Sequence, residues 1–162
     1  LLPYVAKNIY LVDATGLGWL VASFAFGGLL GSIAMVVTGG PRHPERSMLV
    51  YTAVWYGILL GFGHAGSLGA GLFALVLAGF VQNVVMISMT GSLLAAAGDR
   101  FRGRVMGVRM LAVYGLPLGL MASGAFIDRI GYPLTVSALS TVGLVFTVLI
   151  GMKWRASLWR RR

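Results

Sequence analysis

The sequence predicts an all-α polytopic membrane protein, and two observations support this fold class. Hydrophobic residues make up 58% of the 162 residues and charged residues only 10%, whereas a soluble domain carries about 45–50% apolar and about 25% charged residues. The apolar residues also form long runs that recur along the whole chain, separated by short polar stretches. Little sequence therefore remains for a separate soluble domain.

The apolar runs predict five full transmembrane helices plus the end of a sixth, because a helix needs about 20 residues to cross a bilayer. Residues 1–10 are apolar but too short to span, so we interpret them as the end of a truncated span. The five full spans are expected at residues 16–37, 47–64, 67–90, 105–127 and 132–152. Residues 1–152 would thus form one transmembrane unit, followed by a basic cytoplasmic tail at residues 153–162.

Polar segments separate these spans in order along the chain. Residues 38–47 (TGGPRHPERS) form a polar loop with two prolines, and residues 64–67 (HAGS) form a tight turn. The uncharged run that follows exceeds one vertical crossing, so it is expected to tilt or to protrude from the bilayer. The fourth full span follows the basic segment DRFRGR at residues 99–104, and the fifth precedes the tail KWRASLWRRR.

The distribution of Lys and Arg predicts the orientation of the chain. In the topology above, 11 of the 13 basic residues lie on one side of the membrane, and Lys7 and Arg129 lie on the other. The positive-inside rule places the richer side in the cytoplasm. We therefore expect a multi-pass protein of the plasma membrane, the bacterial inner membrane, with a cytoplasmic C-terminus. The loop charges of interest on that side are Arg42, Arg46, Asp99, Arg102 and Arg104.

Composition and placement also restrict the possible partners and chemistry. A net charge of +9 would suit nucleic acid in a soluble protein, but these basic residues lie at the ends of apolar runs, where they meet anionic lipid headgroups. The expected partner is the lipid bilayer, and no nucleic acid is expected. The chain has no cysteine, and His43 and His64 lie on opposite sides of the membrane in the predicted topology. No enzyme activity, metal or cofactor is expected.

Three blocks of sequence carry a resemblance to a known family. They are ATGLGWLVASFAFGGLLGS (residues 14–32), RFRGRVMGVRMLAVYGLPLG (residues 100–119) and GAFIDRIG (residues 124–131). In order and spacing they resemble the C-terminal half of a major facilitator superfamily transporter, in the bacterial drug and siderophore efflux branch. The resemblance covers nearly the whole chain. It implies the C-terminal six-helix half of that fold, with the N-terminal six-helix half missing from this sequence.

The resemblance further implies alternating access, in which two halves rock about a site near the bilayer midplane. The expected function is a secondary active exporter of small hydrophobic or amphipathic molecules, present here as a fragment. Glycines would then permit sliding contact between the halves, and a proline kink could act as a hinge; ordinary packing is the alternative for each. These candidates are Gly27, Gly28, Gly31, Gly115, Pro117 and Gly119.

Aromatic, methionine and amide side chains suit a promiscuous apolar cavity with few polar groups. The candidate substrate-pathway residues are Tyr56, Gln82, Asn83, Met86 and Tyr114. Gln82 and Asn83 lie near the middle of an uncharged span, where a polar group either contacts substrate or forms a hydrogen bond between helices. The sequence leaves both alternatives open for this pair.

The partners of such an exporter would be a small-molecule substrate, the missing half and, if it drives transport, the proton. All four acidic residues lie at the margins of the predicted spans, whereas proton coupling needs a titratable group in the pathway. A proton carrier is therefore expected in the missing half. The alternative function is a stand-alone small membrane protein that acts as a subunit or assembly partner without transport of its own.

Overall fold

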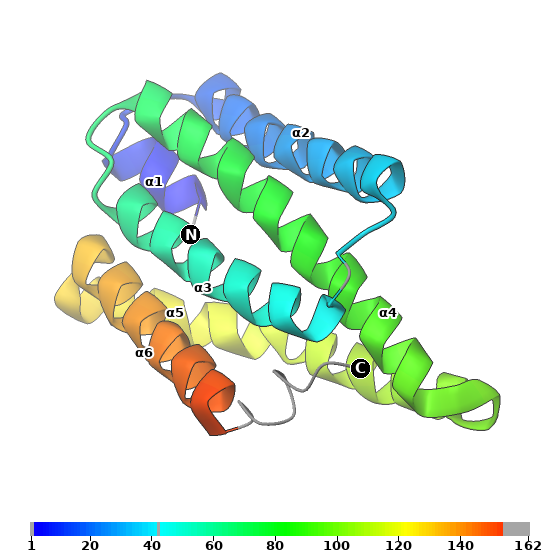
Figure 1. Ribbon diagram of the computed structural model, residues 1–162. Helices are drawn as coiled ribbons and strands as arrows, with labels where there is room; N and C mark the ends of the chain where they lie inside the picture. Colours follow the sequence, from blue (N-terminus) through cyan, green and yellow to red (C-terminus); the bar gives the residue numbers. More distant parts are fainter. Residues whose placement is uncertain (1, 42, 154–162) are drawn as a thin grey trace.

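The computed structural model describes residues 2–41 and 43–153. All the regular elements in these two ranges are helices. The elements are α1 (Leu2–Asn8), α2 (Ala14–Thr38), α3 (Pro44–Gly63), α4 (Leu68–Tyr114), α5 (Leu116–Ile130) and α6 (Tyr132–Lys153). α4 consists of two helices, because Gly98 interrupts it with φ 59° and ψ 172°. The chain bends back at this point, and the second part of α4 leads into α5 (Figure 1).

Local sequence signals explain where α2 and α3 begin and end. The Asp13 carboxylate caps α2, because it accepts hydrogen bonds from the backbone N–H groups of Thr15 and Gly16, both at 3.1 Å. Gly39 ends α2 in the left-handed conformation, with φ 69°, which glycine adopts without steric cost. Pro44 begins α3 in the first turn, where its missing N–H is not needed.

A cluster of buried hydrophobic residues to which all six elements contribute lies at one end of the molecule, while Ala78, Val81 and Val84 are buried further along α4. At that end α1 lies beside the α3–α4 turn and the α5–α6 turn (Figure 1), and we call this the α1 end. At the opposite end, the basic end, lie the α2–α3 loop, the bend of α4 at Gly98 and the end of α6. All six elements contribute to the core, with Val5, Ala6, Leu20, Phe62, Leu75, Ile127, Tyr132 and Val136.

Three helices in the described part of the chain are long and apolar enough to cross a membrane: Ala14–Thr38, Leu68–Gly98 and Tyr132–Lys153. The predicted fold of five full spans plus the end of a sixth is therefore wrong, and so is the six-helix half that the resemblance implied. One reason lies in α3, which begins with Pro, Glu and Arg and carries tyrosine and tryptophan. These residues lower its mean hydropathy below that of a clear span.

The second reason is a break in the chain between α4 and α5. The predicted span at residues 105–127 is divided at Gly115. This residue lies between the last residue of α4, Tyr114, and the first residue of α5, Leu116. α5 has only 15 residues, which is about 22 Å at 1.5 Å per residue. This is short of the roughly 30 Å of a hydrocarbon core.

Some predicted residues lie outside what the structure describes. These are Arg42, the side chain of Asp99, and the tail residues 154–162 of the predicted cytoplasmic segment.

Candidate functional site

α2 and α4 meet along a line of small residues, the glycine seam, formed by Gly27, Gly28 and Gly31 of α2 and Gly79 of α4. All four are buried. A Cβ atom on Gly31 would lie 2.6 Å from the carbonyl oxygen of Phe80, and one on Gly79 would lie 3.0 Å from the backbone nitrogen of Gly28. The two backbones are therefore in direct contact, as small residues permit in membrane helices. The three glycines of α2 thus pack within the chain itself.

Asn83 extends the glycine seam toward the basic end. Its side-chain nitrogen lies against Gly28, in the space that a Cβ atom there would need. The hydroxyl of Ser32 donates a hydrogen bond to the Gly28 carbonyl at 3.0 Å and lies 3.5 Å from Oδ1 of Asn83. The amide of Asn83 therefore joins α2 to α4, which favours the interhelical alternative for this residue.

Gln82 lies on a different face of α4 from Asn83. It shares that face with Met86, Met89 and Leu93, because these positions follow the i, i+4, i+7, i+11 spacing of a helix. Gln82 is half-buried, and Met86 is 40% exposed. The guanidinium of Arg109 lies 3.8 Å from the Met86 sulfur. The face thus leads from an amide near the middle of a candidate span toward arginine at the basic end.

Tyr56 joins α3 to α6. Its ring and hydroxyl occupy the space that a Cβ atom on Gly143 would need, and its ring meets the Trp55 ring edge-on at 5.3 Å between centroids. Tyr114, another predicted pathway residue, is 76% exposed at the end of α4. The structure therefore does not gather the five predicted pathway residues around one cavity.

Gly115, Pro117 and Gly119 lie at the junction of α4 and α5, and all three are exposed. Gly115 has φ −72° and ψ −15°, a helical conformation that any residue adopts. The break therefore follows from Pro117, which occupies the first turn of α5. Proline cannot donate to the carbonyl four residues earlier, and its ring crowds that carbonyl.

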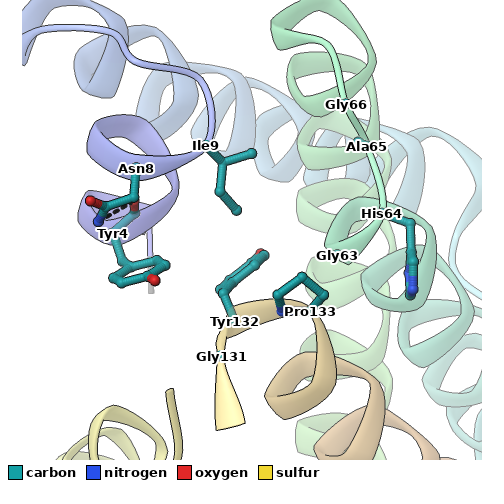
Figure 2. Close-up of a pocket in the computed structure, with 10 residues that line it drawn as sticks. All are labelled: Tyr4, Asn8, Ile9, Gly63, His64, Ala65, Gly66, Gly131, Tyr132 and Pro133. Atoms are coloured by element: carbon teal, nitrogen blue, oxygen red, sulfur yellow. Dashed lines mark hydrogen bonds between the residues drawn. The ribbon is translucent and has the colours of Figure 1, made fainter. Parts of the chain in front are cut away.

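A cavity of about 420 Å³ opens at the α1 end. Figure 2 shows Tyr4, Ile9 and Tyr132 pointing toward one another in it, with the α3–α4 turn on the far side. The Tyr4 and Tyr132 rings stack at 5.9 Å between centroids. The lining residues come from three separate segments of the chain, which are α1 with the residue after it, the α3–α4 turn and the start of α6: Tyr4, Asn8, Ile9, Gly63, His64, Ala65, Gly66, Gly131, Tyr132 and Pro133.

The sequence reasoning missed this cavity, because its walls come from distant segments. Its only sequence signals are turn residues, HAGS at 64–67 and Gly131. They follow the ends of α3 and α5, and both turns lie at the α1 end. The Nδ1 atom of His64 donates a hydrogen bond to the Leu60 carbonyl at 2.9 Å, because a carbonyl oxygen only accepts. Tyr10 is partly buried and packs against the core cluster, and burial raises the pKa of its phenol.

The loop charges that the structure describes lie apart from this cavity. Arg46 lines a cavity of about 430 Å³ between α3 and α6, Arg102 is exposed, and Arg104 lines a groove of about 540 Å³ at the bend of α4. Within the described residues, no group of three or more His, Cys, Asp or Glu residues could hold a metal ion.

Comparison with known proteins adds one relative to this geometry. Over 143 residues the chain is 31% identical to the multidrug efflux pump Tap of Mycolicibacterium fortuitum. The chain is similar to a drug exporter. The similarity covers 85% of the chain but 34% of the pump, so the chain spans about a third of the length of this relative. No protein-family model matches the chain, and no solved structure matches it. Together, the relative and the three apolar helices indicate a membrane protein.

Proposed function

We propose that this chain is part of a secondary active exporter of small hydrophobic or amphipathic molecules, of the major facilitator type. The observation that carries the proposal is the 31% identity to a multidrug efflux pump over 143 residues. Three helices that are long and apolar enough to cross a membrane support it. The chain matches only about a third of that pump, so substrate range and coupling would belong to the whole protein.

The exposed apolar surface of the candidate spans supports the proposal that both a membrane and a protein partner contact this chain. In each candidate span, most of the most apolar stretch is not buried within the chain. The buried share of that stretch is 22% in α2, 33% in the Leu68–Gly98 part of α4 and 22% in α6. Apolar surface on this scale marks a membrane or protein interaction site. We propose that lipid covers part of it and that the remainder of the exporter covers the rest.

Within this proposal, Gln82 is the pathway residue of choice. It is half-buried near the middle of the Leu68–Gly98 helix, and no hydrogen bond to its amide occurs among the described residues. A polar group at such a depth is costly unless it faces water, substrate or another polar group. Met86, on the same face and 40% exposed, would supply an adaptable apolar contact. Asn83 and Tyr56 would instead hold the helices together.

The placement of the basic residues supports a proposal for the orientation of the chain. We propose that the basic end faces the cytoplasm of a bacterial plasma membrane, because Arg102 and Arg104 follow the bend of α4 and Arg46 lies in the first turn of α3. The α1 end, with its cavity, would then face outward. The activity proposed is transport rather than an enzymatic reaction.

The whole product of the native gene can test this function in a bacterial strain that lacks its own drug exporters. Cells are loaded with ethidium, a lipophilic cation, and the fluorescence they retain is followed after loading. Cells that carry the gene should retain less dye than cells with an empty vector. Unchanged retention of ethidium and of a panel of amphipathic dyes, with the protein detected in the membrane, would contradict the exporter.

A further inference from the structure

The chain bends back within α4 at Gly98 (Figure 1). A groove of about 540 Å³ is lined by residues from both sides of this bend. The helix before Gly98 supplies Met89 and Leu93 to its wall, and the helix after Gly98 supplies Val105 and Val108. Two arginines, Arg104 and Arg109, complete the lining together with Phe101. We call it the basic groove, because its wall is apolar except for these two cations.

The two guanidinium groups of the basic groove are held by weak contacts. Arg109 Nη2 lies 3.8 Å from the Met86 sulfur, which is a weak acceptor. The Arg104 guanidinium lies 5.8 Å from the centre of the Phe101 ring. Neither arginine contacts a carboxylate in the described part of the chain. Both therefore keep strong donors for an anion, and charge-assisted hydrogen bonds to phosphate are the strongest that arginine makes.

The length of α4 brings the basic groove to the membrane surface. The Leu68–Gly98 helix has 31 residues, about 46 Å at 1.5 Å per residue. The hydrocarbon core of a bilayer is about 30 Å thick, so the end of this helix near Gly98 reaches the headgroup region. The apolar wall of the groove continues from Leu93 and Met89 back along α4 to Met86, toward the hydrocarbon.

We propose that the basic groove binds an anionic phospholipid. Its phosphate would accept hydrogen bonds from Arg104 and Arg109, and an acyl chain would cover Leu93, Val105 and Val108. A free phosphate would pair with the arginines but leave the apolar wall in water. A zwitterionic lipid would bring its own cation to two arginines. The net charge of +9 adds a general attraction to anionic lipid, whereas the groove supplies a defined site.

Native mass spectrometry of the whole gene product in detergent can test this site. The protein is titrated with dioleoylphosphatidylglycerol and, separately, with dioleoylphosphatidylcholine, so that only the headgroup differs. The wild type should retain the anionic lipid preferentially. Each arginine near an anionic headgroup contributes about a fivefold change in affinity. The double variant Arg104→Gln, Arg109→Gln should therefore bind phosphatidylglycerol about 25-fold more weakly.

Matched variants separate this site from general electrostatics. Arg129→Gln removes an exposed arginine at the C-terminal end of α5 and should leave the lipid preference unchanged. Leu93→Asn, in the apolar wall, should weaken phosphatidylglycerol binding while both arginines remain. If the double variant does not keep the helical circular-dichroism spectrum of the wild type, the single variant Arg104→Gln, at an exposed position, replaces it with an expected fivefold loss.

Three results would overturn the proposal. The first is equal retention of the two lipids by the wild type. The second is an equal loss of binding in Arg129→Gln, which would indicate charge attraction without a site. The third is displacement of the lipid by millimolar inorganic phosphate alone, which would identify an anion site that does not use the apolar wall. All three are independent of whether the protein exports drugs.

Discussion

The side-chain nitrogen of Asn83 on α4 lies against Gly28 on α2, in the space that any larger residue at position 28 would need. The two positions are 55 residues apart in sequence but form one contact. Because Gly28 has no side chain, the Asn83 amide reaches the α2 backbone, where the Ser32 hydroxyl also lies. α2 and α4 are therefore joined by shape and by polar contact, and both can be tested separately.

The shape of the glycine seam predicts the effect of one added methyl group. In Gly31→Ala the new Cβ atom would meet the carbonyl oxygen of Phe80 at 2.6 Å, so the helices must separate. Overpacking of this kind costs about 1–3 kcal/mol. Thermal unfolding of the purified protein in detergent should show a lower Tm. Gly18→Ala on the same helix meets nothing within 4 Å and should not lower it; equal Tm values for both variants would refute direct backbone contact.

The two adjacent amides of α4 should respond differently to replacement by leucine. Asn83→Leu places a branched side chain against Gly28 and removes the contact with Ser32, so we expect a lower Tm. Gln82→Leu removes an amide that has no hydrogen bond in the described part of the chain. Its free energy of unfolding should therefore stay within about 0.5 kcal/mol of the wild type, with little change in Tm. In dye-retention assays Gln82→Leu should change the range of dyes exported. A large loss of stability in Gln82→Leu would assign it a packing role instead.

Pro117 should control the angle between α4 and α5. Pro117→Ala restores an N–H and removes the ring that crowds the carbonyl of Val113, so the two helices can join. The chain has no cysteine, which allows spin labels at introduced Cys residues only. Val108 and Met121 are 68% and 75% exposed. Spin labels at these two positions would report the distance between α4 and α5 by double electron–electron resonance. A longer distance is expected in Pro117→Ala; an identical distance distribution would show that other contacts maintain the break.

The buried hydroxyl of the partly exposed Tyr10 predicts a dependence of stability on alkaline pH. Burial raises its pKa above the value of about 10 for an exposed tyrosine, so the folded protein favours the neutral form. This contribution is fully present below about pH 10 and is lost as the pH rises from there through the raised pKa. Tyr10→Phe should therefore lose less stability than wild type between about pH 9 and 11.

The Tyr10 hydroxyl also lacks a hydrogen-bond partner in the described part of the chain. At neutral pH, Tyr10→Phe should thus be as stable as wild type or slightly more stable, because no bond is lost. Unfolding temperatures over a pH series measure both effects. Tyr4→Phe, which removes an exposed phenol, serves as the control. A wild type and Tyr10→Phe variant with parallel pH curves would contradict a buried phenol.

Composition was sufficient to predict a membrane protein made of helices, and the efflux pump relative agrees with the exporter class. The number of spans could not be predicted by counting apolar residues. Residues 105–127 are apolar enough to suggest a span, but Pro117 removes a backbone hydrogen bond and divides them. In α3, polar aromatic residues and an N-terminal Pro-Glu-Arg make a helix that is ordinary in length but less apolar.

The candidate site shows a second limit of sequence reasoning. Glycines at positions 27, 28 and 31 indicate that something approaches α2 closely, but the pattern does not say what. The partner is α4, some 50 residues further along the chain, and this contact depends on the parallel packing of the two helices. Likewise, Gln82 and Asn83 are neighbours in sequence with the same functional group, and only the position of α2 distinguishes their surroundings.

Because the core cluster lies at the α1 end, we expect the molecule to resist bending more strongly there than at the basic end. Side chains from all six elements interlock at that end, while at the basic end grooves open beside α3 and inside the bend of α4. A rotation of the helices relative to one another would therefore pivot near α1, with displacement increasing toward the basic end. The axis of such a rotation would lie near the α1 end. The largest displacement would occur near Gly98, where α4 bends at the opposite end of the molecule.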